Sequence, residues 1–122
     1  MSRTETALLH LANALVGATG AVYAVMIYLL QPADEWAVVS HPWQPHVQHL
    51  HVLVAPLLVF AAGVAWSRHV EPRLAAAGRP GFATGLPLLL FLLPMTASGY
   101  LLQVAVAPGW RQAWGWVHLL TS

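Results

Sequence analysis

Residues 47–67 read VQHLHVLVAPLLVFAAGVAWS, a run in which no side chain is an acid, a lysine or an arginine. This run is the centre of an uncharged stretch at 36–67, and similar stretches cover 6–33 and 80–110. An α-helix of about 20 apolar residues crosses the hydrocarbon core of a bilayer and pairs its own backbone polar groups there. Each stretch is long enough to hold one such helix. The sequence therefore predicts an integral membrane protein.

The composition leads to the same class. Charged residues make up 7% of the chain and hydrophobic residues 58%, whereas a typical soluble domain has about 25% charged residues. The 122 residues have room for one transmembrane helical domain, 1–122, and for no separate soluble domain. The absence of cysteine excludes disulfides, thiolate zinc sites and iron–sulfur clusters. With five arginines, no lysine and four acids, the chain also lacks the basic surface that nucleic-acid binding requires.

The expected fold class is all-α, an integral membrane helical bundle. We expect three full transmembrane helices, at about 7–30, 47–69 and 84–106, followed by a short helical segment at 112–122. The last segment, about 16 Å long, is too short to span the bilayer. It belongs either to a fourth helix that a partner completes or to a shortened form of a four-helix protein.

The arginines predict how the bundle is oriented. Arg3 precedes the first span and three more arginines follow the second, whereas the loop between these spans carries Asp34 and Glu35. Because arginine is enriched in cytoplasmic loops, we expect the N-terminus and the 67–83 loop to be cytoplasmic. Five of the six tryptophans then lie near the outer face, as in an interfacial aromatic belt. The predicted location is the inner (cytoplasmic) membrane of a bacterium.

Histidines occur near the ends of the predicted spans, where ionisable side chains are costly and usually functional. His51 and His118 are expected near the outer face, and His10 and His69 near the cytoplasmic face. His51 and His69 are 18 residues apart, which in a straight α-helix is five turns and places both on one face. His49 points away from that face, so His49 and His51 cannot both face an inward site. We expect His51 to face the bundle, because the residues on its face form the smoother stripe.

Two imidazoles at similar depth on different helices are what a bis-histidine haem b needs. We therefore predict that His51 and His118 ligate a haem near the outer face. A second haem, between His10 and His69, is conceivable near the cytoplasmic face, where Arg68, with Arg3 or Arg73 as alternatives, could pair with its propionates.

Small residues in the first and third spans could give a flat ring system access to the helix backbones. Gly17 lies on a mostly small-residue face of the first span, which also contains His10. In the third span, Gly99 could make room for a ring whose edge bonds to Ser98 or Tyr100. Ordinary helix packing explains the same glycines equally well.

The run from His41 to His69, the Ser98-Gly99-Tyr100 sequence and His118 together resemble small bacterial four-helix membrane proteins related to the b-type cytochromes. The resemblance implies haem b bound between helices, with axial roles for His51 and His118 and less directly for His10 and His69. It also implies electron transfer between membrane quinones and soluble redox partners. The expected partners of the chain are the lipid bilayer and other membrane or periplasmic redox subunits.

Two other functions fit the sequence. The chain could be an accessory or structural subunit of a larger membrane redox or photosynthetic complex, without a haem of its own. It could also bind copper or zinc through His41, His46, His49 and His51, because imidazole suits both metals. A hydrolase is disfavoured, because the four acids all lie near the membrane edges and could not orient a histidine base in the bundle.

Overall fold

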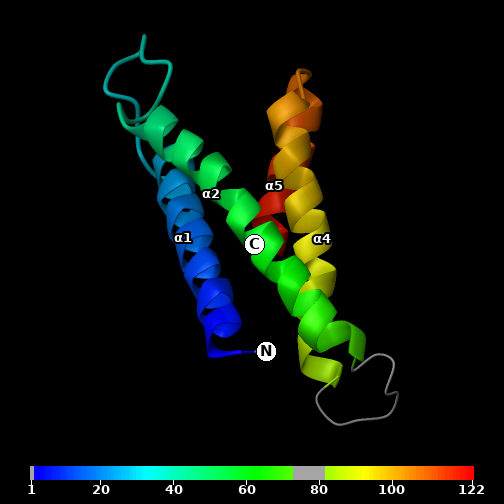
Figure 1. Cartoon of the computed structure of the whole chain (residues 1–122). Helices are drawn as coiled ribbons and strands as arrows, with labels where there is room; N and C mark the ends of the chain where they lie inside the picture. Colours follow the sequence, from blue (N-terminus) through cyan, green and yellow to red (C-terminus); the bar gives the residue numbers. More distant parts are fainter. Residues whose placement is uncertain (1, 73–81) are drawn as a thin grey trace. The chain divides into compact units, whose positions relative to one another are not determined.

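The structure is a computed structural model that describes residues 2–72 and 82–122, with side chains described for 2–72 and 90–122. It contains the helices α1 (Arg3–Tyr28), α2 (Gln44–Ala65), α4 (Phe82–Val104) and α5 (Pro108–Thr121) (Figure 1). A short π-helix, η1 (Trp66–Val70), continues α2. The described residues contain no strand. The prediction of an all-α fold is therefore confirmed, and the four expected helices lie within a few residues of their predicted positions.

Two segments are long and apolar enough to cross a membrane. They are α1 and the segment Gln44–Val70, which combines α2 with η1. In the third predicted span, the part with described side chains is a shorter apolar helix, Leu90–Val104. Two candidate spans, rather than the expected three, are thus found in the described part of the chain. Insertion into a membrane and its direction stay predictions.

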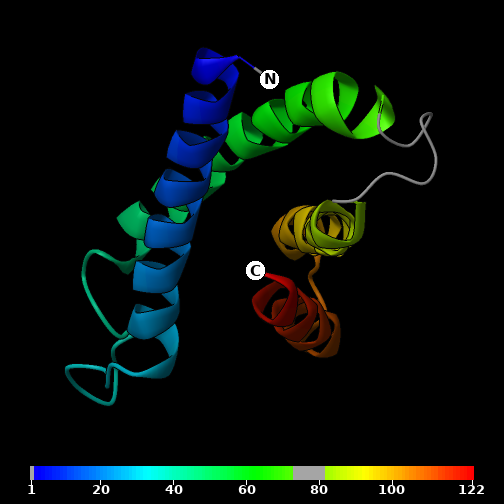
Figure 2. The same cartoon turned by 90° about the horizontal axis from the view of Figure 1, so that it is seen from below.

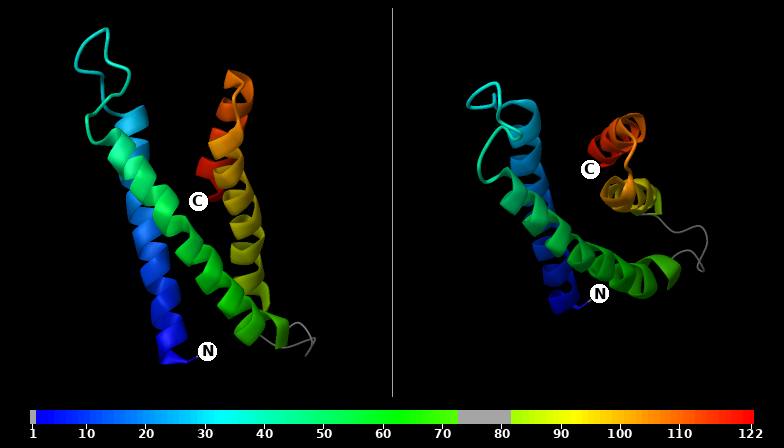
Figure 3. Two further views of the ribbon diagram at one scale, coloured as in Figure 1. Left: turned by 45° about the horizontal axis from the view of Figure 1, so that its top comes forward. Right: turned by 90° about the horizontal axis from the view of Figure 1, so that it is seen from above.

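The chain forms two compact units, residues 1–69 and 70–122. In the first, α2 runs antiparallel to α1 and crosses it at an angle (Figures 1 and 3). In the second, α4 and α5 lie side by side and antiparallel (Figure 2). Each unit is therefore a helical hairpin. The prediction of a single domain over 1–122 stays a prediction.

In the first hairpin, α1 begins with a capping box. The Ser2 hydroxyl accepts a hydrogen bond from the Glu5 backbone N–H, and the Glu5 carboxylate accepts one from the Ser2 backbone N–H. These bonds pair two backbone N–H groups at the helix start that have no intrahelical acceptor. The side chains that become buried between the helices are small or aliphatic: Ala12, Val16, Leu58 and Ala61.

The second hairpin is joined at its turn by Arg111. Its guanidinium Nη1 donates hydrogen bonds to the carbonyl oxygens of Leu102 and Ala105, at 3.3 and 3.1 Å. Carbonyl groups at the C-terminal end of a helix lack intrahelical donors, and a basic side chain can satisfy them. Pro108 then starts α5 in the first turn of the helix, where no backbone N–H is required. A side chain of α5 thus forms hydrogen bonds with the end of α4 and with the turn that follows it.

The π-helix changes the relation between His51 and His69. In η1 the backbone hydrogen bonds run from residue i to i+5 instead of i+4, which changes the rotation per residue. The expected five-turn register assumed one regular α-helix through His69. That assumption was wrong, because the helix changes its winding three residues before this histidine. A shared face for His51 and His69 no longer follows from their spacing.

Candidate functional site

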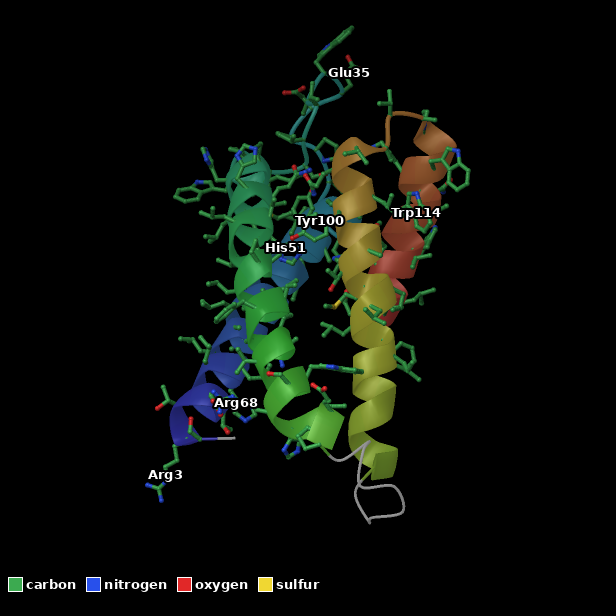
Figure 4. The ribbon with its side chains drawn as sticks, turned by 45° about the vertical axis from the view of Figure 1, so that its right-hand side comes forward. Arg3, Glu35, His51, Arg68, Tyr100 and Trp114 are labelled. Atoms are coloured by element: carbon green, nitrogen blue, oxygen red, sulfur yellow. The ribbon has the colours of Figure 1, made fainter. Side chains whose placement is uncertain are left out.

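The His51 side chain lies against α1. Its ring nitrogen Nδ1 is 3.0 Å from the Thr19 hydroxyl oxygen. A Cβ atom built at Gly20 would lie only 3.0 Å from Cε1 of the ring and 3.4 Å from Nδ1. His51 is half-buried, whereas His49 is exposed, and Figure 4 labels His51 on α2. The choice of His51 over His49 as the histidine that faces a neighbouring helix agrees with this geometry.

The His118 side chain lies against α4 in a closely similar way. Its Nδ1 is 2.8 Å from the backbone carbonyl oxygen of Met95 and 3.3 Å from the Ser98 hydroxyl. A Cβ atom built at Gly99 would lie 3.0 Å from Cε1 and 3.3 Å from Nδ1. Ser98 is completely buried, and His118 is half-buried. The imidazole therefore occupies the space that the missing side chain of Gly99 leaves open.

These contacts determine which nitrogen of His118 carries a proton. A carbonyl oxygen can only accept a hydrogen bond, so Nδ1 of His118 must donate to Met95. The Ser98 hydroxyl donates to the Pro94 or Met95 carbonyl, at 2.6 and 3.0 Å. Its oxygen then faces Nδ1 as a second acceptor. A neutral imidazole with its proton on Nδ1 has its lone pair on Nε2.

The Thr19 hydroxyl in the first hairpin is oriented in the same way as the Ser98 hydroxyl in the second. It lies 2.7 Å from the Leu15 carbonyl oxygen and 3.1 Å from that of Val16, and both can only accept its single proton. The hydroxyl oxygen is therefore oriented to accept from His51 Nδ1. In both hairpins, a hydroxyl residue followed by glycine on the first helix meets a histidine on the second.

The two hairpins also share sequence features that could have revealed this arrangement. Ala18-Thr19-Gly20 in α1 corresponds to Ala97-Ser98-Gly99 in α4, and a tryptophan lies eight residues before each histidine. Each of the helices α1 and α4 begins 17 residues before its glycine, Gly20 or Gly99. Thr19, Gly20 and Met95 were not predicted as site residues. The tripeptides were available as a signal, but the Met95 contact uses a backbone carbonyl and leaves no trace in the sequence.

The two glycines predicted to face a cofactor differ in the structure. Gly17 is exposed, and a Cβ atom built there has nothing within 4 Å. The residues of α1 that pack against α2 include Ala12 and Val16, so the face with Gly17 and His10 is not the packed one. Gly99 does make room for a ring, and in the structure that ring is the His118 imidazole.

The residues predicted for a second haem lie in the first unit. His10 is exposed on α1, and His69 is half-buried in η1. Arg68 lies next to the start of α1 (Figure 4), and its Nε is 3.9 Å from a carboxylate oxygen of Glu5. The Arg68 side chain is 70% exposed, so this is a long, solvated ion pair. Arg73, another candidate partner for the propionates, lies outside the described residues.

The copper or zinc site predicted as an alternative is not formed. Among the described residues, which include all four of its histidines, no three histidine or acidic side chains gather closely enough to hold a metal ion. Two of the four have local partners instead. His41 Nδ1 accepts a hydrogen bond from the Trp43 backbone N–H at 3.1 Å, and the His46 ring packs edge-on against Trp43.

The two hairpins thus each hold one imidazole that donates from Nδ1, or is positioned to do so, and such a ring binds a metal through Nε2. A haem iron needs only two protein nitrogens, because the porphyrin provides the other four, so the absence of a three-ligand cluster does not bear on haem. No family model, curated protein or solved structure matches the chain.

Proposed function

We propose that the chain is a membrane-bound b-type cytochrome subunit in which His51 and His118 are the axial ligands of one haem b. The subunit carries electrons between the membrane quinone pool and a redox partner. The observation that supports this most is the repetition of one local arrangement, in which an imidazole is held over a glycine by hydrogen bonds to Nδ1. Ordinary helix packing does not require the same polar arrangement in two separate hairpins.

The chemistry of these residues fits a bis-histidine haem. Haem b can be held by two histidines, and His51 and His118 would be the residues that hold it here. Ligating histidines typically donate their other ring N–H to a carbonyl or similar acceptor, which fixes the orientation of the ring. His118 makes this bond to Met95. The haem, when bound, supplies reversible one-electron transfer.

The surface of the chain supports a membrane location. Many large apolar side chains are exposed on the helices; examples are Leu11, Leu53, Phe60, Leu93 and Leu120. In water such a surface would be unfavourable, whereas lipid chains can cover it. We therefore propose the lipid bilayer as the immediate environment of both hairpins.

A spectroscopic test of three histidine variants addresses this proposal. The purified wild-type protein should give the reduced-minus-oxidised difference spectrum of haem b. His51→Ala and His118→Ala should each abolish it while the protein stays inserted. His49→Ala is the matched control, because His49 is on the same helix but exposed, and this variant should keep the full signal.

A pyridine haemochrome assay on protein of known concentration should give about one haem per chain. A ratio near two that falls in His10→Ala would instead indicate a second haem at His10 and His69. If the wild type binds no haem, the proposal is wrong and the role of an accessory subunit remains. Loss of the signal in His49→Ala but not in His51→Ala would refute the ligand assignment.

A further inference from the structure

We infer that Thr19 is a positioning residue for His51, with the same role that the Met95 backbone carbonyl has for His118. Each accepts a hydrogen bond from Nδ1 of its histidine, so that Nε2 is the nitrogen presented to the haem iron. The statement that Nε2 binds the haem iron rests on the proposed function. The position of the proton on Nδ1 of each ring does not depend on haem.

The contact between His118 and Met95 in the second hairpin indicates which ring nitrogen carries the proton, and the His51 contact is compared with it. The backbone carbonyl oxygen of Met95 can only accept a hydrogen bond. Its 2.8 Å distance to Nδ1 of His118 is typical of a good N–H···O hydrogen bond. The proton of a neutral His118 ring is therefore on Nδ1. The Ser98 hydroxyl, at 3.3 Å, is the more distant of the two acceptors.

The contact in the first hairpin uses a side chain where the second uses the backbone. The 3.0 Å distance from Thr19 Oγ1 to His51 Nδ1 is also within the normal range. Because the Thr19 proton has the Leu15 carbonyl at 2.7 Å as its acceptor, the hydroxyl oxygen can accept from Nδ1–H. A threonine hydroxyl that both donates to its own helix and accepts from the neighbouring ring fixes that ring relative to α1.

The inference predicts different results for the two hydroxyl residues. Thr19→Val keeps the shape of the side chain but removes the acceptor. Loss of such a partner of a ligating histidine lowers metal affinity about 10- to 100-fold, so we expect haem affinity to fall by this factor. Thr19→Ser restores the hydroxyl and should restore the affinity. In Ser98→Ala the shorter bond to Met95 remains, so haem affinity should fall much less.

The reduction potential gives a measurement that a merely structural role would not change. A hydrogen bond from Nδ1–H makes the imidazole a stronger electron donor and favours ferric iron. Thr19→Val should therefore shift the midpoint potential upward, and Thr19→Ser should return it to the wild-type value. Ser98→Ala removes only the longer of the two contacts to His118 Nδ1 and should shift the potential less than Thr19→Val does. Equal potentials in wild type and Thr19→Val, or no rescue by Thr19→Ser, would overturn the inference.

Nitrogen NMR of the haem-free protein separates this inference from the proposed function. With ¹⁵N-labelled histidine, and with His51→Ala and His118→Ala to assign the signals, both rings should carry a proton on Nδ1. Thr19→Val should redistribute the proton of His51 only. A proton on Nε2 of His51 in the wild type would refute the role of Thr19, even if haem binds. A protein that binds no haem but shows the expected proton positions refutes the cytochrome proposal alone.

Discussion

Replacing Gly20 by alanine tests whether the contact between α1 and His51 is as close as the structure shows. The new Cβ atom would lie 3.0 Å from Cε1 of His51, whereas carbon atoms in good contact are about 3.5–4.0 Å apart. The imidazole must therefore move away from α1 by about 0.5 Å. A movement of that size would lengthen the 3.0 Å Thr19–His51 hydrogen bond to about the limit for such a bond.

The expected change in stability is a balance of two terms. Overpacking of a close contact costs about 1–3 kcal/mol, and alanine stabilises a helix over glycine by about 1 kcal/mol. Gly20→Ala should thus be neutral or destabilising by up to about 2 kcal/mol, with weaker haem binding. Gly17→Ala is the matched control on the same helix. Its Cβ atom meets nothing within 4 Å, so only the favourable helix term of about 1 kcal/mol applies.

The assay is thermal unfolding of both variants in detergent, followed by circular dichroism and by haem absorbance. We expect the unfolding midpoint of Gly17→Ala to rise and that of Gly20→Ala to stay level or fall, with loss of haem from the latter at lower temperature. If the two variants have the same midpoint and the same haem retention, His51 does not lie against Gly20, and the packing described for the first hairpin is incorrect.

Two other predictions concern the second hairpin and the orientation of the chain. Gly99→Ala should weaken haem binding, because its Cβ atom would lie 3.0 Å from Cε1 of His118, whereas Gly115→Ala on α5, with nothing within 4 Å, should not; equal haem titrations for the two variants would contradict this. Cysteines introduced at Ala76 and Ala37 should be labelled by an impermeant reagent from the cytoplasmic and the outer side, respectively, as the arginine distribution predicts, and labelling of Ala37→Cys from the cytoplasmic side would reverse the topology.

The helices were predictable because long uncharged runs and proline breaks mark them in the sequence. Pro45 and Pro108 lie in the first turns of α2 and α5, where proline is tolerated. The π-helix was not predictable, because the sequence Trp66–Val70 has no residue that requires the wider turn. The helix that contains His51 and His69 was therefore predicted from the sequence, but the face on which His69 lies was not.

The site was predicted only in part, for a physical reason. Periodicity assigns residues to faces of one helix, and it indicated that His51 and not His49 should face inward. It does not tell which face of α1 that histidine meets, so the contact of His51 with Gly20 was not predicted. The bond from His118 to the Met95 carbonyl depends on main-chain geometry, which residue identity does not encode.

The use of a backbone carbonyl for one histidine and a side-chain hydroxyl for the other has a consequence for how the sequence can diverge. Every amino acid has a main-chain carbonyl, so residue 95 can change freely without loss of the bond to His118. Position 19 has no such freedom, because serine and threonine are the small residues that carry a hydroxyl at the required distance from the backbone. Orthologous chains that retain both histidines should therefore have different amino acids at position 95, but only serine or threonine at position 19.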